Sequence, residues 1–158
     1  MKKVVLTDLE GFPKVEGEPL SGVQVQSYYD IPDEETFVQR CNDAPIIAWA
    51  WFYLTREVID RCPALEMASY LGVGAGSRID LKYANSRGIT VCNTPHYGDV
   101  AVAEHAIALM MASARRLVQA DRSMHQGRWE PFGGTELRGA IMGIVGLGGV
   151  GVELAAIG

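Results

Sequence analysis

Three glycines near the end of the sequence have the spacing that lets a backbone hold a pyrophosphate. Gly146, Gly148 and Gly151 form a GxGxxG pattern between the apolar run IMGIV and the helix-forming run VELAA. In a dinucleotide site the first glycine permits a tight turn, the second lets backbone reach the phosphates, and the third permits close helix packing. The helix N-terminus then favours negative charge. A glycine-rich turn that binds no ligand is the alternative interpretation.

A second glycine-rich stretch, Leu71–Asp80, reads LGVGAGSRID and follows a predicted strand. Ligands of open α/β sheets bind beyond the carboxyl ends of the strands, and backbone N–H groups in such a turn can hold a carboxylate. The same residues equally fit a tight strand-to-helix turn with no ligand.

Histidines and cysteines give no sign of a metal site or of a nucleophile. The histidines are His96, His105 and His125, and the cysteines are Cys41, Cys62 and Cys92. Neither set has the spacing of metal ligands, the cysteines are odd in number, and none forms a CxxC pair. We therefore predict no metal, no disulfide framework and no catalytic histidine among them, and we expect a reducing, cytoplasmic environment.

Composition limits the classes of partner and the number of domains. The 158 residues are 48% hydrophobic and 21% charged, which suffices for one core and at most part of a second. A net charge of −5 disfavours nucleic acid and anionic membranes. The longest apolar stretch, Val100–Met111, contains Glu104 and is shorter than the ~20 residues that span a bilayer. We expect no membrane segment.

Short β-prone runs alternate with helical patterns, which indicates an α/β fold with a parallel sheet. The predicted strands are Lys3–Thr7, Val23–Tyr29, Pro45–Ala50, Glu66–Val73, Thr90–Asn93 and Ile141–Leu147. The predicted helices are Asp33–Cys41, Thr55–Cys62, Ile79–Ser86 and one long helix, Asp99–His125. Thr55 and Asp99 are the expected N-caps of two of them, and Gly88 is an expected stop signal.

The long predicted helix separates two segments of the chain. Its apolar positions Ala103, Ile107, Met110, Ala114 and Leu117 recur at helical spacing. A loop with Pro131 and several glycines, Gly127–Ala140, follows it. We place the domain boundary near Gly98–Asp99, so that residues 1–98 form one segment and residues 99–158 the other.

Several motifs together resemble the D-isomer-specific 2-hydroxyacid dehydrogenases, the group that includes glycerate, lactate, phosphoglycerate and formate dehydrogenases. The matching pieces are YLTREVIDRCPALEMASYLGVGAGSRIDL, RGITVCNTP, VAEHAIALMMASAR, GRWE and GTELRGAIMGIVGLGGVG. They follow the family's order and cover more than half of the chain. The resemblance implies an incomplete flavodoxin-like substrate domain, a long interdomain helix and the first strand, turn and helix of a Rossmann domain that binds NAD or NADP.

The resemblance also assigns roles to individual residues. Backbone at Gly74 and Ala75 would hold the substrate carboxylate, with Gly74 also beside the nicotinamide, and Trp49 to Phe52 would shape the substrate pocket. The implied cofactor contacts are Gly74, Val102, Gly146, Gly148, Gly149, Val150 and Gly151. Gly149 stands where the family commonly has arginine.

The arginine, acidic residue and histidine that act in this family would all fall after Gly151, and so would the acidic residue that binds the adenine ribose. No catalytic residue is therefore assigned within these 158 residues. We expect the N-terminal part of an NAD(P)-dependent oxidoreductase acting on the CH–OH group of a D-2-hydroxy acid, inactive alone, with weak or no dinucleotide binding and with self-association as a homodimer or larger. The alternative is a non-catalytic, self-associating or binding module derived from the family. Which acid is the substrate, and whether NAD or NADP binds, stay open.

Overall fold

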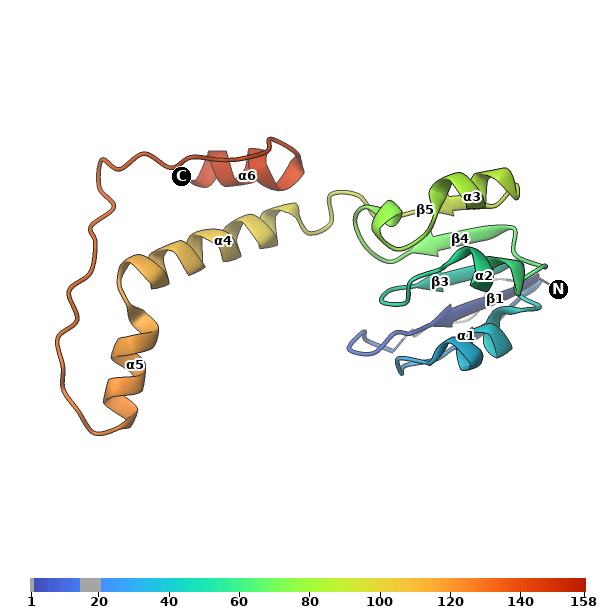
Figure 1. Cartoon of the computed structure of the whole chain (residues 1–158), viewed down its shortest axis with the longest axis horizontal. Coiled ribbons are helices and arrows are strands. Elements are labelled where there is room, and N and C mark those ends of the chain that lie inside the picture. The colour runs from blue at the N-terminus through green and yellow to red at the C-terminus, as the bar shows by residue number, and fades with distance from the viewer. Residues whose placement is uncertain (1, 15–20) are drawn as a thin grey trace. The chain divides into compact units, whose positions relative to one another are not determined.

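The computed structural model describes residues 2–14 and 21–158 and divides into two compact units, Met1–Pro95 and His96–Gly158 (Figure 1). The boundary between the units lies between Pro95 and His96, three residues before the boundary near Gly98–Asp99 that the sequence suggests. Each unit has its own architecture.

The first unit is a five-stranded parallel sheet. Its strands are β1 (Lys2–Thr7), β2 (Val23–Ser27), β3 (Ile46–Trp49), β4 (Met67–Tyr70) and β5 (Thr90–Cys92). Their spatial order is β2-β1-β3-β4-β5, which is the flavodoxin-like order. Each of these strands lies inside or within one residue of its predicted range. The α/β class and the flavodoxin-like sheet are confirmed.

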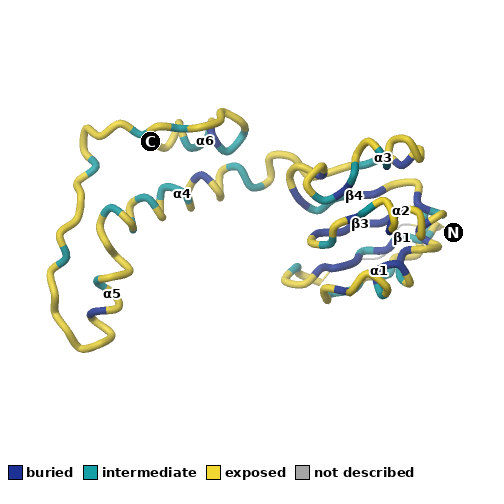
Figure 2. The backbone as a smooth tube through the Cα atoms, viewed as in Figure 1, coloured by how far each residue is buried: buried dark blue, intermediate teal, exposed yellow. Residues whose placement is uncertain are grey.

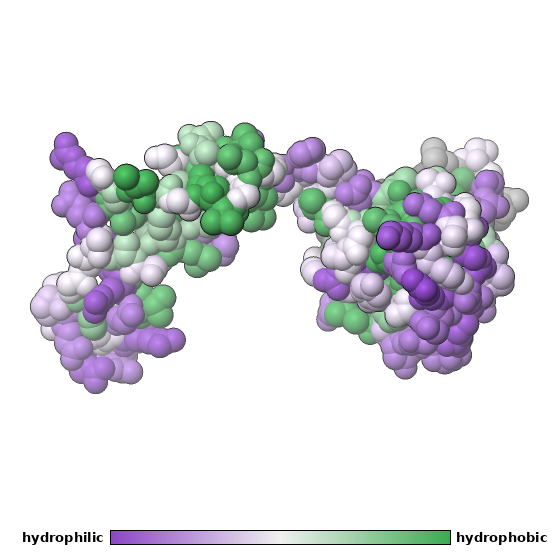
Figure 3. Space-filling model, turned by 45° about the horizontal axis from the view of Figure 1, so that its top comes forward, coloured by the Kyte–Doolittle hydropathy of each residue, from purple (hydrophilic) through white to green (hydrophobic). Residues whose placement is uncertain are grey.

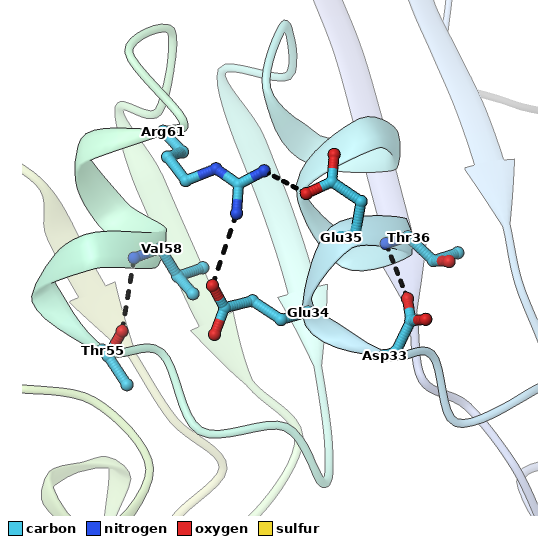
Figure 4. A network of polar contacts seen from close by, with 7 residues as sticks. All are labelled: Asp33, Glu34, Glu35, Thr36, Thr55, Val58 and Arg61. Atoms are coloured by element: carbon cyan, nitrogen blue, oxygen red, sulfur yellow. Dashed lines mark hydrogen bonds and ion pairs between the residues drawn. The ribbon is translucent and has the colours of Figure 1, made fainter.

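Three helices connect the later strands: α1 (Glu34–Cys41), α2 (Arg56–Asp60) and α3 (Leu81–Ser86). Each begins after a residue whose side chain accepts a backbone N–H bond from the first turn: Asp33, Thr55 and Asp80. Thr55 is thus the N-cap that the sequence predicts. Arg61, just after α2, donates to Glu34 (3.3 Å) and Glu35 (2.5 Å) of α1 and so links the two helices (Figure 4).

The core lies between these helices and one face of the sheet. Val5, Ile47 and Ala68 stand side by side in the strand register and are fully buried. Buried residues of α1, α2 and α3 join the same cluster. Figure 2 shows the buried residues of the described chain concentrated in this unit. The carboxyl ends of the strands therefore extend from a packed hydrophobic core.

The second unit contains α4 (Asp99–Ala114), α5 (Leu117–His125) and α6 (Gly149–Ile157). The prediction of one helix over Asp99–His125 is wrong, because Arg116 has a left-handed backbone (φ 52°). Thr135 N–H donates to the Ala114 carbonyl (2.8 Å), so the loop after α5 satisfies the end of α4. Asp99 is the first helical residue, and the N-cap is Gly98.

The predicted strand Ile141–Leu147 is not formed. Ile141 is 97% exposed, although its segment has the composition of a buried parallel strand. A strand needs a hydrogen-bonded neighbour, and residues 96–158 include no strand that could pair with it. The turn and helix that follow are present.

Helices α4 and α6 pack against each other within this unit. Ala103 of α4 is fully buried, and Ile107 and Met110 line a pocket of about 300 Å³ together with Leu137 and Ile157. Hydrophobic side chains gather over these two helices in Figure 3. The apolar stripe of α4 is thus partly covered by α6, whereas Val102 and Leu109 are more than half exposed.

Candidate substrate and dinucleotide sites

The site in the first unit starts from Asp8, directly after β1. Its carboxylate accepts three consecutive backbone N–H groups of the loop that follows β3: Ala50 (2.6 Å to Oδ1), Trp51 (2.8 Å to Oδ2) and Phe52 (2.5 Å to Oδ2). Strands β1 and β3 are neighbours at the point where the strand order reverses. Ligands of this fold bind at that point. The Asp8 carboxylate therefore already accepts the three N–H groups that could otherwise bind an anionic ligand at this point.

Asp8 is fully buried and has a left-handed backbone (φ 55°), which aspartate tolerates better than most residues. Burial raises the pKa of its carboxyl above the ordinary value, and the three N–H bonds and the Arg78 charge oppose that rise. Every hydrogen bond described for the carboxyl is one that it accepts. This arrangement suits the ionised form.

Arg78 fixes the same loop from the other side. Its Nη1 donates to the Trp51 carbonyl (2.7 Å), and its own carbonyl accepts the Leu54 N–H (2.9 Å). Leu54 and Ile79 also form an isolated parallel bridge. The loop after β3 is therefore tied both to β1 and to the chain that follows the glycine-rich turn.

Side chains alternate between core and surface along this loop. The Trp49 ring is fully buried and donates from Nε1 to the Phe52 carbonyl (3.1 Å), and the Phe52 ring stacks on Phe37 at 4.3 Å. Trp49 therefore packs in the core and supports the loop from that side. Trp51 and Tyr53 are 48% and 50% exposed; Trp51 lies within the stretch Trp49–Phe52 that the resemblance assigns to the substrate pocket, and Tyr53 lies one residue beyond it.

The glycine-rich turn after β4 presents backbone N–H groups. Gly74 has φ 75° and precedes the short 3-10 helix η1 (Ala75–Ser77). Its carbonyl accepts from the N–H (3.1 Å) and the hydroxyl (3.0 Å) of Ser77. In the described part of the chain, the N–H groups of Gly74 and Ala75 donate to no acceptor. They are available to a carboxylate.

The predicted pyrophosphate turn has the backbone that the GxGxxG pattern implies. Gly146 has φ 96°, and a Cβ at Gly151 would lie 2.1 Å from the Gly146 carbonyl oxygen, so only glycine fits there. Gly148 is the N-cap of α6, and a Cβ there would meet no atom within 4 Å. The open space beside Gly148 is what close approach of a phosphate requires.

Gly149 is explained by its neighbour on α4. A Cβ at this position would lie 1.9 Å from Oδ2 of Asp99, whose carboxylate also contacts Nδ1 of His96 (2.7 Å). The Asp99 side chain is 13% exposed, and its carboxylate must move aside for any side chain larger than glycine's at this position. Val102, in the first turn of α4, is 53% exposed.

The cysteines of the core are unsuited to nucleophilic chemistry. Burial raises the pKa of the Cys41 thiol to about 12 and that of Cys62 to about 11, so both stay protonated near neutral pH. Within residues 2–14 and 21–158 no three metal-ligating side chains come together. No helix of that part is long and apolar enough to cross a membrane.

Comparison with known proteins identifies the chain's relatives. The profile of the D-isomer specific 2-hydroxyacid dehydrogenase catalytic domain matches residues 4–153. A D-3-phosphoglycerate dehydrogenase of Archaeoglobus fulgidus is 39% identical over 137 residues, which is 85% of this chain and 26% of that protein. The chain thus spans about a quarter of the length of the curated relatives it matches.

Solved structures share the fold over nearly the whole chain. An acyclic imino acid reductase, Bsp5, in complex with NADPH and D-Arg has a TM-score of 0.81 at 27% identity, covering 98% of this chain and 52% of that one. The NAD-dependent formate dehydrogenase of Staphylococcus aureus, in complex with NAD, has a TM-score of 0.75 at 25% identity, covering 99% and 53%. With the profile match, the sheet order and the glycine turns in agreement, the chain belongs to the D-isomer specific 2-hydroxyacid dehydrogenase family.

Proposed function

We propose that this chain supplies the substrate domain and the first nucleotide-binding turn of an NAD(P)-dependent oxidoreductase that acts on the CH–OH group of a D-2-hydroxy acid or reduces the corresponding 2-oxo acid. The observation that carries the proposal is a pair of glycine turns whose N–H groups have no acceptor among the described residues: Gly74–Ala75 in one unit and Gly148–Val150 in the other. Family membership supports the reaction class.

In the first unit, the substrate carboxylate would accept hydrogen bonds from the N–H groups of Gly74 and Ala75. The left-handed backbone of Gly74 orients these groups without strain. The loop held by Asp8 and Arg78 borders the same edge of the sheet, because Leu71 N–H donates to the Trp49 carbonyl (2.8 Å). A small acid bound there is oriented by rigid backbone.

In the second unit, the turn fits a dinucleotide. Gly146 and Gly151 shape it, and the N–H groups of Gly149 and Val150 at the start of α6 would donate to the pyrophosphate. Val102, in the same unit, would lie on the nicotinamide side. When bound, the nicotinamide ring supplies or accepts the hydride. The family's arginine, acid and histidine have no counterparts assigned in these residues, so we expect binding without turnover by the 158 residues alone.

Amide chemical shifts test the two turns separately. Titration of the ¹⁵N-labelled chain with D-lactate should shift Gly74 and Ala75. Gly74→Ala should abolish that response, because alanine is strained at φ 75°. Gly88→Ala is the matched control, since Gly88 has φ 74° and equally open space but ends α3. Equal responses of the two variants would refute the carboxylate site.

NADH should shift Gly149 and Val150, with weak affinity. Gly148→Ala adds a methyl group where no protein atom lies within 4 Å, so it should block the phosphates and leave the fold intact. Gly143→Ala, also open, is the control. Binding of NADH that survives Gly148→Ala would contradict the pyrophosphate turn.

A second candidate function is a self-associating module, which the exposed apolar side chains of residues 96–158 favour. Val100, Val102 and Leu109 of α4 are each more than half exposed. Burying such area against a second copy would contribute about 25 cal/mol per Å². Sedimentation at micromolar concentration should then report a mass above 17.2 kDa, and a monomer would exclude this candidate.

A further inference from the structure

Two segments beside the Gly74 turn carry no charged side chain. The twelve residues 44–55 and the seven residues 71–77 include no Asp, Glu, Lys or Arg. These two segments follow or contain neighbouring strands, since Trp49 pairs with Tyr70 in the sheet register. A substrate held by Gly74 and Ala75 would therefore place its other end near uncharged residues.

The cations closest along the chain already have partners. Arg56 forms an ion pair with Asp80, with Nε–Oδ2 at 2.8 Å. Arg78 donates to the Trp51 carbonyl and faces the Asp8 charge. The N–H groups of residues 50–52, which could otherwise hold a phosphate, are taken by Asp8. Among the described residues, a phosphate group here would lie close to the buried Asp8 carboxylate, and the nearby Arg78 guanidinium already donates to the Trp51 carbonyl and faces the Asp8 charge.

Aromatic and aliphatic side chains form the exposed part of this surface. Trp51, Tyr53 and Val73 are 48%, 50% and 51% exposed. The Trp51 ring is held in place, because its Nε1 donates to the Glu10 carbonyl (3.3 Å) and its plane meets Phe12 edge to face at 6.3 Å. A fixed ring loses little entropy when a ligand packs on it. The surface is therefore a preformed wall for an apolar group.

We propose that the site takes 2-hydroxy or 2-oxo acids with an uncharged, apolar side chain, aromatic or branched, and discriminates against phosphorylated acids. The inference rests on the proposed function and names its substrate class. It separates this chain from relatives that are named D-3-phosphoglycerate dehydrogenases. The acid's carboxylate binds the Gly74 turn, and its side chain packs on Trp51.

Two acids that share the carboxylate but differ in the side chain test the proposal. D-Phenyllactate and D-3-phosphoglycerate are titrated in turn into the ¹⁵N-labelled chain. The readouts are the amides of Gly74 and Ala75 and the indole N–H of Trp51. Phenyllactate should shift all three and bind at least tenfold more tightly than phosphoglycerate. Tighter binding of phosphoglycerate would overturn the substrate class alone, whereas failure of both probes would overturn the proposed function and the inference with it.

Substitutions of Trp51 and Tyr53 distinguish the loss of ligand packing on these rings from a general loss of binding. Trp51→Ala should weaken phenyllactate binding about tenfold and leave D-lactate unchanged, since lactate has no side chain to pack there. Trp129→Ala, which removes an 86% exposed ring in the other unit, is the control and should change neither. Tyr53→Ala is the second wall variant if Trp51→Ala fails to fold. Phenyllactate binding that is unaffected by both wall variants would refute the proposal, as would equal loss of lactate and phenyllactate.

Discussion

Replacing Asp8 by asparagine should destabilise the first unit by about 3 kcal/mol. Asparagine suits the left-handed backbone at φ 55° and keeps the size of the side chain, so the change isolates the carboxylate. Its oxygen can replace Oδ2 and still accept from Trp51 and Phe52. Its NH₂ group must then take the place of Oδ1 and face the Ala50 N–H, which loses its acceptor.

The magnitude follows from these three bonds. A buried N–H left without a partner costs about 2 kcal/mol, and replacing a charged acceptor by a neutral one weakens the remaining two bonds by about 0.5 kcal/mol each. Ala50 is 4% exposed, so water cannot easily replace the lost acceptor. The urea midpoint of the first unit should fall by on the order of 2 M.

Urea unfolding followed by tryptophan fluorescence measures this change, because Trp49 is fully buried next to the affected loop. Asp30→Asn is the control: Asp30 is an exposed carboxylate paired with Arg40, and its loss should cost less than about 1 kcal/mol. If Asp8→Asn and Asp30→Asn unfold at the same urea concentration, the three N–H bonds do not hold the loop and the reasoning fails.

Three further outcomes are expected. Thr7→Val should stabilise the first unit by about 1 kcal/mol in the same urea assay, because the buried Thr7 hydroxyl has no partner among the described residues; a loss of stability would reveal a hidden partner. Gly149→Ala should lower the melting temperature of the second unit, and Asp99→Ala in the same chain should restore it, since the added Cβ meets the Asp99 carboxylate; additive effects would contradict the clash. Iodoacetamide at pH 8 should modify the exposed Cys92 well before Cys41, whose raised pKa keeps it a buried thiol; mass spectrometry showing comparable rates would disprove this.

Local signals predicted most of the first unit. The parallel sheet follows from the alternation of β-prone and helical runs, and Thr55 caps α2 as its position before the helix suggests. Gly88 ends α3 with the left-handed backbone expected of a stop signal. These features depend on residues a few positions apart, so the sequence displays them directly.

Features that depend on distant residues were not predictable in the same way. Asp8 meets Ala50 across 42 positions, and nothing in the run LTDLE indicates that partner. The helix break at Arg116 has no glycine or proline to mark it, and it accompanies the contact from Thr135. The apolar residues 141–147 have the right composition for a strand, but a strand also needs a neighbour to pair with.

The site residues divide in the same manner. The spacing of the glycines at 74, 146, 148 and 151 predicts the two turns. The buried state of Trp49 and the exposure of Trp51 depend on the direction of each side chain relative to the core, and composition treats the two tryptophans alike. The reason for Gly149 appears only once α4 lies against α6.

The alternation of core and surface residues in the loop after β3 has an evolutionary consequence. Trp49 and Leu54 are almost completely buried, whereas Trp51 and Tyr53 extend into solvent from the same short segment. Under the substrate class proposed above, mutations at the outward positions would change which acid the protein binds without changing how well it folds, since surface substitutions typically alter stability by less than about 0.5 kcal/mol. A lineage could therefore drift between acid preferences by single substitutions at residues 51 and 53, while selection for folding holds residues 49 and 54 constant.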